Sequence, residues 1–313
     1  RMIGQDRARQ AWRRSRLAVT NLHGRIGELG IACDLAPRNS LYLAGNALGP
    51  TELQAEAAAR RLAGIASTYL SAAQLKERFG IARKGAVLSQ YNLALDPRKL
   101  TAGLLRKALE RGARFFAPLE AGTIHATRED VTVETKQGPR IRARHVVLAT
   151  GYELTDLVPA AAHKIISTWA IATRPQPRAL WPGAGFIWEA SDPYLYMRAT
   201  ADGRVICGGE DEDFVDEEAR DALIGAKTKR IAAKLGRLFP NLDTTPEFAW
   251  AGAFGTTTTG LPYIGALPRH PRIFSVMGYG GNGITFAQFA SEIIPAAIAG
   301  KEDSDAALFG FSR

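Results

Sequence analysis

The sequence is poor in the residues that most often bind metals or act as nucleophiles. It has two cysteines in 313 residues, Cys33 and Cys207, and no C-x-x-C pair. This excludes a disulfide framework and a cysteine-ligated zinc site. Its five histidines show neither H-x-x-x-H nor H-E-x-x-H spacing, and G-x-S-x-G is absent. We therefore expect no metal site and no serine hydrolase chemistry.

Long apolar runs are also missing. No stretch approaches the roughly 18 to 20 uninterrupted apolar residues that a membrane-spanning helix needs, and the basic beginning lacks the apolar core of an export signal. The chain is 46% hydrophobic and 23% charged, which is enough for a sizeable core and two domains. We expect a cytoplasmic protein without a membrane partner.

Positive charge is in excess and unevenly placed. Lys and Arg outnumber Asp and Glu by 40 to 31, a net charge of +9. Six arginines crowd the beginning, and apolar residues recur at helical spacing between them, which predicts an amphipathic helix with a solvated basic face ending near Gly30. A patch for an anionic substrate or RNA is the alternative, but no aromatic residues are interleaved for base stacking, so a nucleic-acid partner is not expected. The arginines are Arg1, Arg7, Arg9, Arg13, Arg14 and Arg16, and the apolar stripe is Ala8, Trp12, Ser15, Val19, Leu22, Ile26 and Leu29.

The middle of the chain alternates between helix and strand signals. Capping boxes at Thr51–Gln54 and Ser71–Gln74 each predict a helix start, and Asp96-Pro97 places an N-cap and a first-turn proline before another helix. Apolar alternation and continuous apolar runs then predict strands. The predicted strands are 41–44, 131–135, 141–149 and several within 167–214, and a long helix is predicted from about 216 to 239.

The most informative stretch lies near the end of the chain. A strand, Arg272–Met277, runs into the glycine turn Gly278–Gly283 and then into an apolar helix. The spacing satisfies G-x-G-x-x-G, but 30 residues remain after Gly283 and cannot supply a second strand with a ribose-binding acid. The turn can serve as a backbone anion site, because glycine allows close approach and the first N–H groups of a helix favour negative charge. A tight turn that needs positive φ values is the alternative.

Three further segments precede this turn, and their order and spacing along the chain are informative. They are 141–151, Trp250–Gly255 and Gly260–Gly265, with Thr256 to Thr259 just before the last. Over nearly all of the chain, the four segments resemble the FAD-dependent oxidoreductases of the D-amino-acid oxidase family. The resemblance implies a mixed α/β fold in which an FAD-binding layered sheet is interleaved with an antiparallel-sheet substrate domain. The implied domains are 1–84, a helical part of the substrate or cap region, 159–249, the substrate domain, and 85–158 with 250–313, which together form the FAD-binding domain.

The same resemblance implies FAD as cofactor and names the residues that would contact it. Thr150 and Gly151 match the end of a strand near the adenosine half of FAD. Ala121 matches a position whose backbone contacts adenine, and the final glycine turn matches the segment that contacts the isoalloxazine. The hydroxyl of Thr285 is implied to donate to the flavin C2 carbonyl or N3 edge, and a local bond to the helix backbone is its alternative. The complete implied set is Ala121, Thr150, Gly151, Pro262, Gly280, Gly281, Asn282, Gly283, Ile284 and Thr285.

One part of the family pattern is missing. The family carries an N-terminal βαβ unit whose glycine turn cradles the FAD pyrophosphate, and before Ala113 this sequence has no apolar strand followed by such a turn. We therefore expect an N-terminally incomplete fold, and weak FAD binding by this chain alone. The alternatives are a cofactor-free remnant, or one subunit of a split flavoprotein whose partner chain supplies the βαβ unit.

Three candidate catalytic residues lie on one predicted strand. Tyr194, Tyr196 and Arg198 alternate and so share a face, where a guanidinium beside two hydroxyls could bind a substrate carboxylate. In the alternative, the tyrosines pack and the arginine pairs with Asp202 or Glu210. Cys207, in the neighbouring apolar strand, is expected to be an inert core thiol.

Two departures from the family pattern narrow the expected substrate. Phe254 stands where the family's amino-acid oxidases carry a carboxylate-binding arginine, and Thr259 stands where an aspartate is usual. The Tyr-x-Arg strand followed by Gly208-Gly209 is more similar to the gamma-glutamylputrescine oxidoreductase branch. The implied function is oxidation of the C–N bond of an amine or amino acid by hydride transfer to flavin. A tRNA-modifying flavin oxidase is a further alternative.

Overall fold

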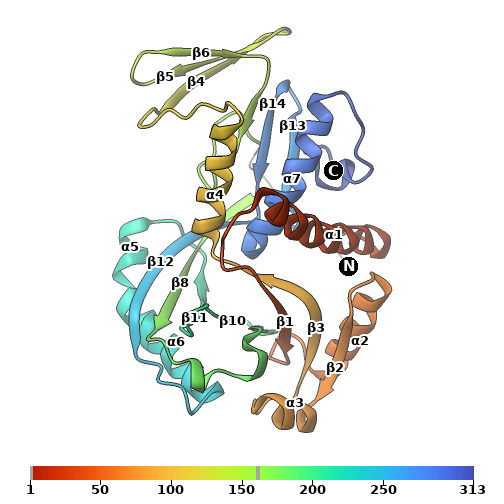
Figure 1. Ribbon diagram of the computed structural model, residues 1–313, viewed down its shortest axis with the longest axis vertical. Coiled ribbons are helices and arrows are strands. Elements are labelled where there is room, and N and C mark those ends of the chain that lie inside the picture. Colours follow the sequence, from red (N-terminus) through yellow and green to blue (C-terminus); the bar gives the residue numbers. More distant parts are fainter. Residues whose placement is uncertain (1–2, 160–162) are drawn as a thin grey trace. The chain divides into compact units, whose positions relative to one another are not determined.

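The computed structural model describes residues 3–159 and 163–313 (Figure 1). It has a mixed α/β fold, as predicted, and divides into two compact units. Each unit is assembled from segments that are far apart in the sequence. Unit 1 comprises residues 1–33, 96–164 and 255–313, and unit 2 comprises residues 34–95 and 165–254.

Unit 1 contains two three-stranded sheets. In the first, in the order β13-β14-β7, strand β14 (His270–Met277) pairs antiparallel with β13 (Tyr263–Leu267) and parallel with β7 (Val146–Leu148). The second sheet has the order β4-β5-β6. The remaining elements of this unit are α1 (Gln5–Leu29), α4 (Pro97–Glu110), β4 (Ala121–Ala126), β5 (Val131–Thr135), β6 (Arg140–Ala143), α7 (Gly283–Ile298) and α8 (Ala306–Phe309).

Alternate residues of β14 pack on different partners. Phe274 and Val276 join Phe289 of α7 in one apolar cluster, whereas Ile273 and Met277 join Val131 of β5 in another. This is the alternation expected of a strand covered on both faces, and it explains the largely apolar sequence before the glycine turn.

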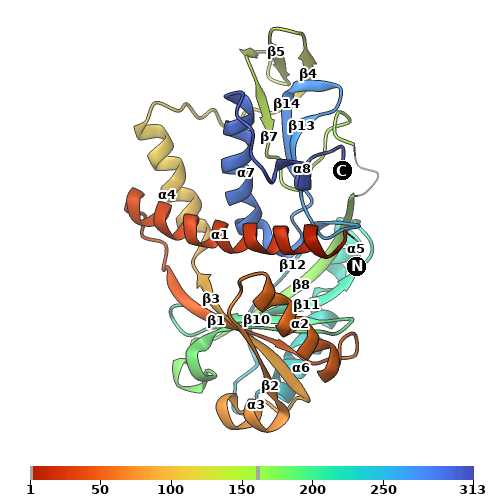
Figure 2. The same cartoon turned by 90° about the vertical axis from the view of Figure 1, so that its right-hand side faces the viewer.

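Helix α1 turns a different stripe inward from the one predicted. Its buried residues are Ala11, Arg14, Ala18 and Ile26, whereas Trp12 is 42% exposed. Ala11 and Ala18 pack in the same cluster as α7, and Figure 2 shows the two helices in contact. The small alanine side chains allow this close approach. Because of it, residues 1–33 group with unit 1, and not with 34–84 as the predicted domain boundaries had it.

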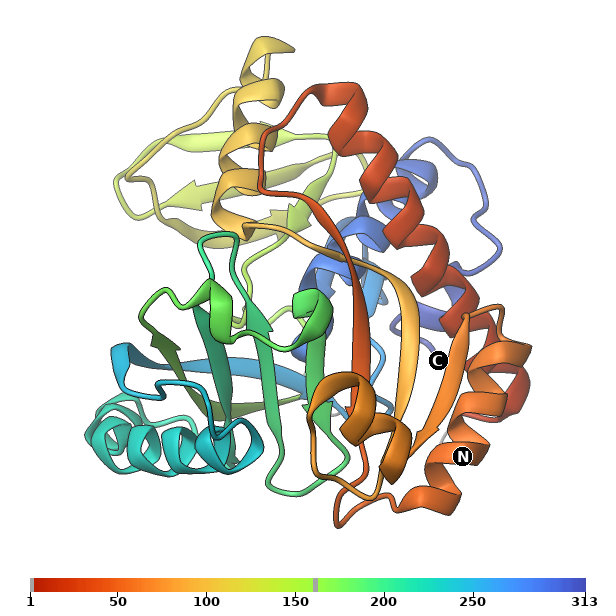
Figure 3. The same cartoon turned by 60° about the horizontal axis from the view of Figure 1, so that its bottom comes forward.

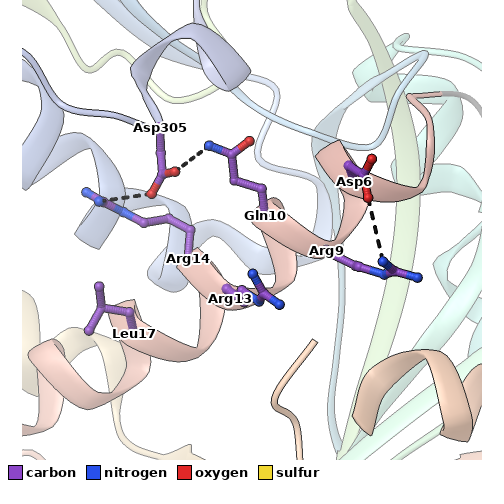
Figure 4. A pocket seen from close by; sticks show the side chains of 7 residues that line it. All are labelled: Asp6, Arg9, Gln10, Arg13, Arg14, Leu17 and Asp305. Atoms are coloured by element: carbon purple, nitrogen blue, oxygen red, sulfur yellow. Dashed lines mark hydrogen bonds and ion pairs between the residues drawn. The ribbon is translucent and has the colours of Figure 1, made fainter. Parts of the chain in front are cut away.

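The assignment of Arg14 to a solvated basic face was wrong. Its guanidinium is buried and surrounded by three carboxylates, with Nη2 2.7 Å from Glu292 Oε2 and 2.9 Å from Asp303 Oδ2, and Nη1 3.3 Å from Asp305 Oδ2. Gln10 Nε2 also donates to Asp305 Oδ1 at 2.6 Å (Figure 4). This cluster joins α1 to α7 and to the segment that follows it.

Replacing Arg14 by Ala should lower the free energy of unfolding by about 3 to 5 kcal/mol, because three partly buried carboxylates would lose their cation. The matched control is Arg13→Ala, at the exposed neighbouring position, where a change within about 0.5 kcal/mol is expected. Guanidinium denaturation of both variants measures the difference. Equal effects of the two substitutions would contradict this account.

Unit 2 is built on an eight-stranded sheet with the order β12-β8-β11-β10-β9-β1-β3-β2, whose orange edge strands lie side by side in Figure 3. Trp169, Leu195 and Cys207 of the sheet pack with Ile231 and Leu235 of α6. The elements are β1 (Ala36–Leu43), α2 (Pro50–Leu62), β2 (Ser67–Ser71), α3 (Ala72–Phe79), β3 (Gly85–Ala94), β8 (His163–Thr173), β9 (Phe186–Glu189), β10 (Leu195–Ala199), β11 (Val205–Glu212), α5 (Glu217–Ala222), α6 (Ile224–Leu238) and β12 (Pro246–Thr257).

Local signals were partly confirmed. The capping box at Ser71–Gln74 and the Asp96 N-cap are both present. The predicted box at Thr51 was wrong, because α2 begins two residues earlier, where Glu52 Oε2 accepts from the Gly49 N–H. The predicted helix 216–239 is two helices that meet at Leu223. Region 34–84, predicted as a mainly helical covering layer, contains the strand predicted at 41–44, observed as β1, and also the unpredicted strand β2.

Candidate active site

The site in unit 1 lies at the carboxyl edge of the parallel pair β7 and β14. Since parallel strands end at the same edge, Thr150 and Gly151 after β7 come to the same edge as the glycine turn after β14. Pro262 joins them, because the next residue, Tyr263, pairs with Met277. The rings of Tyr152 and Tyr279, which follow the two strands, are 6.0 Å apart.

The glycine turn is open and its backbone donors are uncapped. Gly278 and Gly280 have φ values of 72° and 51°, so the predicted need for positive φ is confirmed. The N-cap residue of α7, Asn282, makes no side-chain cap bond, and it is exposed together with Gly281. A Cβ built on Gly280 or Gly281 would meet no atom within 4 Å. The 3-10 turn Gly280–Asn282 leads directly into α7, and the Asn282 N–H donates to the Tyr279 carbonyl at 3.1 Å. The space beside Gly280 and Gly281 lets a ligand approach the backbone at the start of α7, as a backbone anion site requires.

Side chains beside the turn suit a flat ring with one polar edge. Ile284 is 43% exposed, and Thr285 is half-buried. In the described part of the chain the Thr285 hydroxyl makes no hydrogen bond to the helix backbone. These groups fit the anionic edge of a flavin. They do not also fit the pyrophosphate, because one helix start cannot serve both ends of FAD.

Ala121 lies in the second sheet of unit 1, where its contact with adenine stays a prediction, and Thr150 and Thr259 have local partners. Ala121 is exposed at the start of β4, opposite Thr135. Thr150 donates its hydroxyl to the Glu153 carbonyl. Thr259 Oγ1 accepts from the Leu261 N–H at 3.4 Å, so this threonine helps to hold the loop before β13.

His163 is a residue of this site that sequence reasoning missed. It lies against the glycine turn, since a Cβ built on Gly278 would be 3.4 Å from its Cδ2 and one on Gly255 would be 2.1 Å from its Nε2. Its Nε2 is buried without a hydrogen-bond partner, and burial lowers its pKa. A lone histidine gives no spacing signal, so the sequence could not have indicated this placement.

In unit 2, β10 directs the predicted catalytic side chains to one face. Leu195 and Met197 enter the core, so Tyr196 and Arg198 point to the other face of the sheet. Arg198 Nη1 donates to the Leu95 carbonyl at 2.9 Å. The predicted alternative partners of Arg198 are engaged by other cations, Asp202 by Arg204 and Glu210 by Lys234.

The two tyrosine rings lie together, with centroids 5.9 Å apart. Tyr196 extends across β11 at Gly208, because a Cβ built there would lie 2.4 Å from its hydroxyl oxygen. Burial raises the pKa of both Tyr194 and Tyr196, so both remain neutral phenols near pH 7. The Cys207 thiol is buried and its pKa is raised, consistent with an inert core residue.

Asp211 completes this cluster and was not predicted. Its Oδ1 is buried without a hydrogen-bond partner, as is the Thr168 hydroxyl. Burial raises the pKa of Asp211, while the nearby hydroxyls of Thr168 and Tyr194 only partly offset that effect. The preceding Glu210 has a φ of 58°, which interrupts the alternation along β11. A sequence pattern of strict alternation therefore could not place Asp211.

Asp211→Asn should stabilise the protein near neutral pH. A carboxyl whose folded-state pKa is raised loses stability as pH rises through that pKa, and the cost disappears below the unfolded pKa of aspartate. Lys227 lowers the pKa of Asp211 and Asp192 raises it, but burial is the largest cause. Chemical denaturation across pH measures the effect, with exposed Glu218→Gln as control. A gain that persists at acidic pH would contradict this explanation.

No helix in the described part of the chain has both the length and the hydropathy needed to cross a membrane. Within the same residues, no group of three or more His, Cys, Asp or Glu could hold a metal ion.

Solved structures share this fold. Glycine oxidase from Geobacillus kaustophilus is 20% identical with a TM-score of 0.80, over 96% of this chain and 81% of that one. L-proline dehydrogenase from P. horikoshii is 17% identical with a TM-score of 0.77, over 95% of this chain and 81% of that one. At these identities the similarity shows the fold alone.

Curated relatives and a family model identify the family. The oxidoreductase OrdL of Rhizobium meliloti is 26% identical over 66% of this chain and 47% of that protein. Gamma-glutamylputrescine oxidoreductase of Escherichia coli is 27% identical over 69% of this chain and 50% of that protein. The chain thus spans about half the length of these relatives. The model described as FAD dependent oxidoreductase matches residues 2–295, and the chain therefore belongs to this family, DAO.

Proposed function

We propose that this protein takes part in the FAD-dependent oxidation of the C–N bond of an amine or amino acid. The observation that carries the proposal is the edge where β7 and β14 end, with an open glycine turn leading into an uncapped helix. The family is FAD dependent. When bound, FAD supplies the hydride acceptor for the carbon beside nitrogen.

The residues of unit 1 would hold the flavin ring. The N–H groups at the start of α7 place partial positive charge where a reduced flavin is negative, and Gly280 and Gly281 leave room for close approach. Ile284 offers an apolar surface and Thr285 an available hydroxyl. These contacts orient the ring and stabilise its charge, and no protein acid is needed for the hydride step.

The substrate class rests on two observations. The names of the relatives and structural neighbours include an oxidase of glycine and an oxidoreductase of gamma-glutamylputrescine. Phe254 cannot replace the bidentate guanidinium that the amino-acid oxidases are implied to use for the α-carboxylate. We favour an amine for this reason.

Anaerobic mixing of the FAD-loaded protein with primary and secondary amines and amino acids tests the function. Loss of the oxidised flavin absorbance with an amine is expected. Flavin that dithionite reduces, but that no amine or amino acid reduces, would overturn the proposal. Weak FAD binding by this chain alone remains a prediction, and a gain in affinity on adding a separate βαβ polypeptide would favour the split flavoprotein.

Gly281→Asp should weaken FAD binding about tenfold, a loss of roughly 1.4 kcal/mol, because its carboxylate would occupy the helix N–H groups and repel the flavin edge. Gly281→Ala is the matched control, since nothing lies within 4 Å of its added Cβ. Fluorescence titration with FAD measures both affinities. Equal losses in the two variants would show that bulk, and not charge at the helix start, limits binding.

A further inference from the structure

The face of the unit 2 sheet that does not carry the α6 cluster holds a row of aromatic residues. Strand register aligns Tyr42 with Trp188, Trp188 with Tyr196 and Tyr196 with Gly208, on four neighbouring strands. Directly paired residues share a face. The Tyr42 and Trp188 rings have centroids 5.5 Å apart. The row ends where Tyr196 lies over Gly208, beside Tyr194 and Asp211.

The charge at this end of the row is negative and incompletely compensated. The cation that lowers the pKa of Asp211 is Lys227, whose Nζ already binds the Glu210 carbonyl and the Glu212 carboxylate, each at 2.6 Å. Lys227 also lies over the Trp169 ring, 4.4 Å from its centroid. Asp192 adds a second negative charge near Asp211. A carboxylate ligand would be repelled here, whereas a cation would be attracted.

The available hydrogen-bonding groups point to the same ligand. Asp211 Oδ1 and the Thr168 oxygen make no hydrogen bond of good geometry. The Thr168 and Tyr194 hydroxyls interact with the Asp211 carboxylate and lower its pKa, but by less than burial raises it. The tyrosine ring faces attract cations. Arg198, two residues from Tyr196, donates to the Leu95 carbonyl and so has a structural anchor.

We propose that Asp211, Tyr194 and Tyr196 form a binding subsite for an ammonium group of the substrate. This rests on the proposed function and names the charge that the substrate presents to unit 2. The ammonium must carry at least one N–H to satisfy Asp211 Oδ1, which excludes a quaternary ammonium. The assignment reverses the expectation, drawn from the sequence, of a carboxylate bound by the same strand.

Calorimetry with the full chain tests the subsite, using butylammonium, tetramethylammonium and butyrate as probes. Butylammonium should bind more tightly than the other two, and Asp211→Asn should weaken its binding about tenfold. Glu218→Gln removes an exposed negative charge of the same unit and should leave the affinity unchanged. Unchanged affinity in Asp211→Asn, or tighter binding of butyrate, would overturn the subsite.

A second pair of variants separates the rings from the carboxylate. Tyr196→Phe keeps the ring, so its affinity for butylammonium should stay within about threefold of the unchanged protein. Tyr196→Leu should lower this affinity by more, because the cation–π contribution is lost. Equal affinity in the Leu variant would remove Tyr196 from the subsite.

The two proposals fail separately. If an amine reduces the flavin but the Asp211→Asn variant binds butylammonium as tightly as the unchanged protein, the subsite is overturned and the oxidase function stands. If butylammonium binding depends on Asp211 but no amine reduces the flavin, the subsite stands and the oxidase function is overturned.

Discussion

A parallel pairing of three residues, Val146 to Leu148 with Ile273 to Ser275, is the constraint on which the cofactor side of this protein depends. It joins segments more than 120 residues apart in the sequence. Because both strands end at the same edge, the turns that follow them lie next to each other, and the rings of Tyr152 and Tyr279 meet there. The apolar residues on both faces of β14 hold this register, since a shift by one residue would exchange its two clusters.

The sheet of unit 2 uses alternation in the same way, to separate a core face from a face that carries aromatic side chains. Leu195 and Met197 enter the core, and this fixes Tyr196 on the opposite face. Gly208 and the positive φ of Glu210 are two local departures on the neighbouring strand. The first makes room for a ring, and the second breaks the regular alternation just before Asp211. We place the proposed ammonium subsite where the regular pattern is interrupted.

Sequence patterns predicted the features that depend on residue spacing within one element. They missed the features that depend on residues from distant parts of the chain. The glycine turn, the Asp96 cap and the shared face of Tyr196 and Arg198 all follow from spacing within one element. The burial of Arg14 depends on carboxylates almost 300 residues away, and the setting of His163 depends on two glycines of other segments. Asp211 escaped notice because the groups around it come from β8, from the loop before β10 and from α6.

Gly208 has a consequence for how such a protein could diversify. It lies on the same strand as Asp211 and three residues before it, and its neighbours Cys207 and Gly209 face the core or the adjoining backbone. An added methyl at Gly208 would lie 2.4 Å from the Tyr196 hydroxyl oxygen and 3.0 Å from the Trp169 carbonyl oxygen, so it would displace the tyrosine and also press on the neighbouring strand β8. A change in the placement of the Tyr196 ring at this position therefore also involves the backbone of the sheet, which restricts how such a protein could diversify.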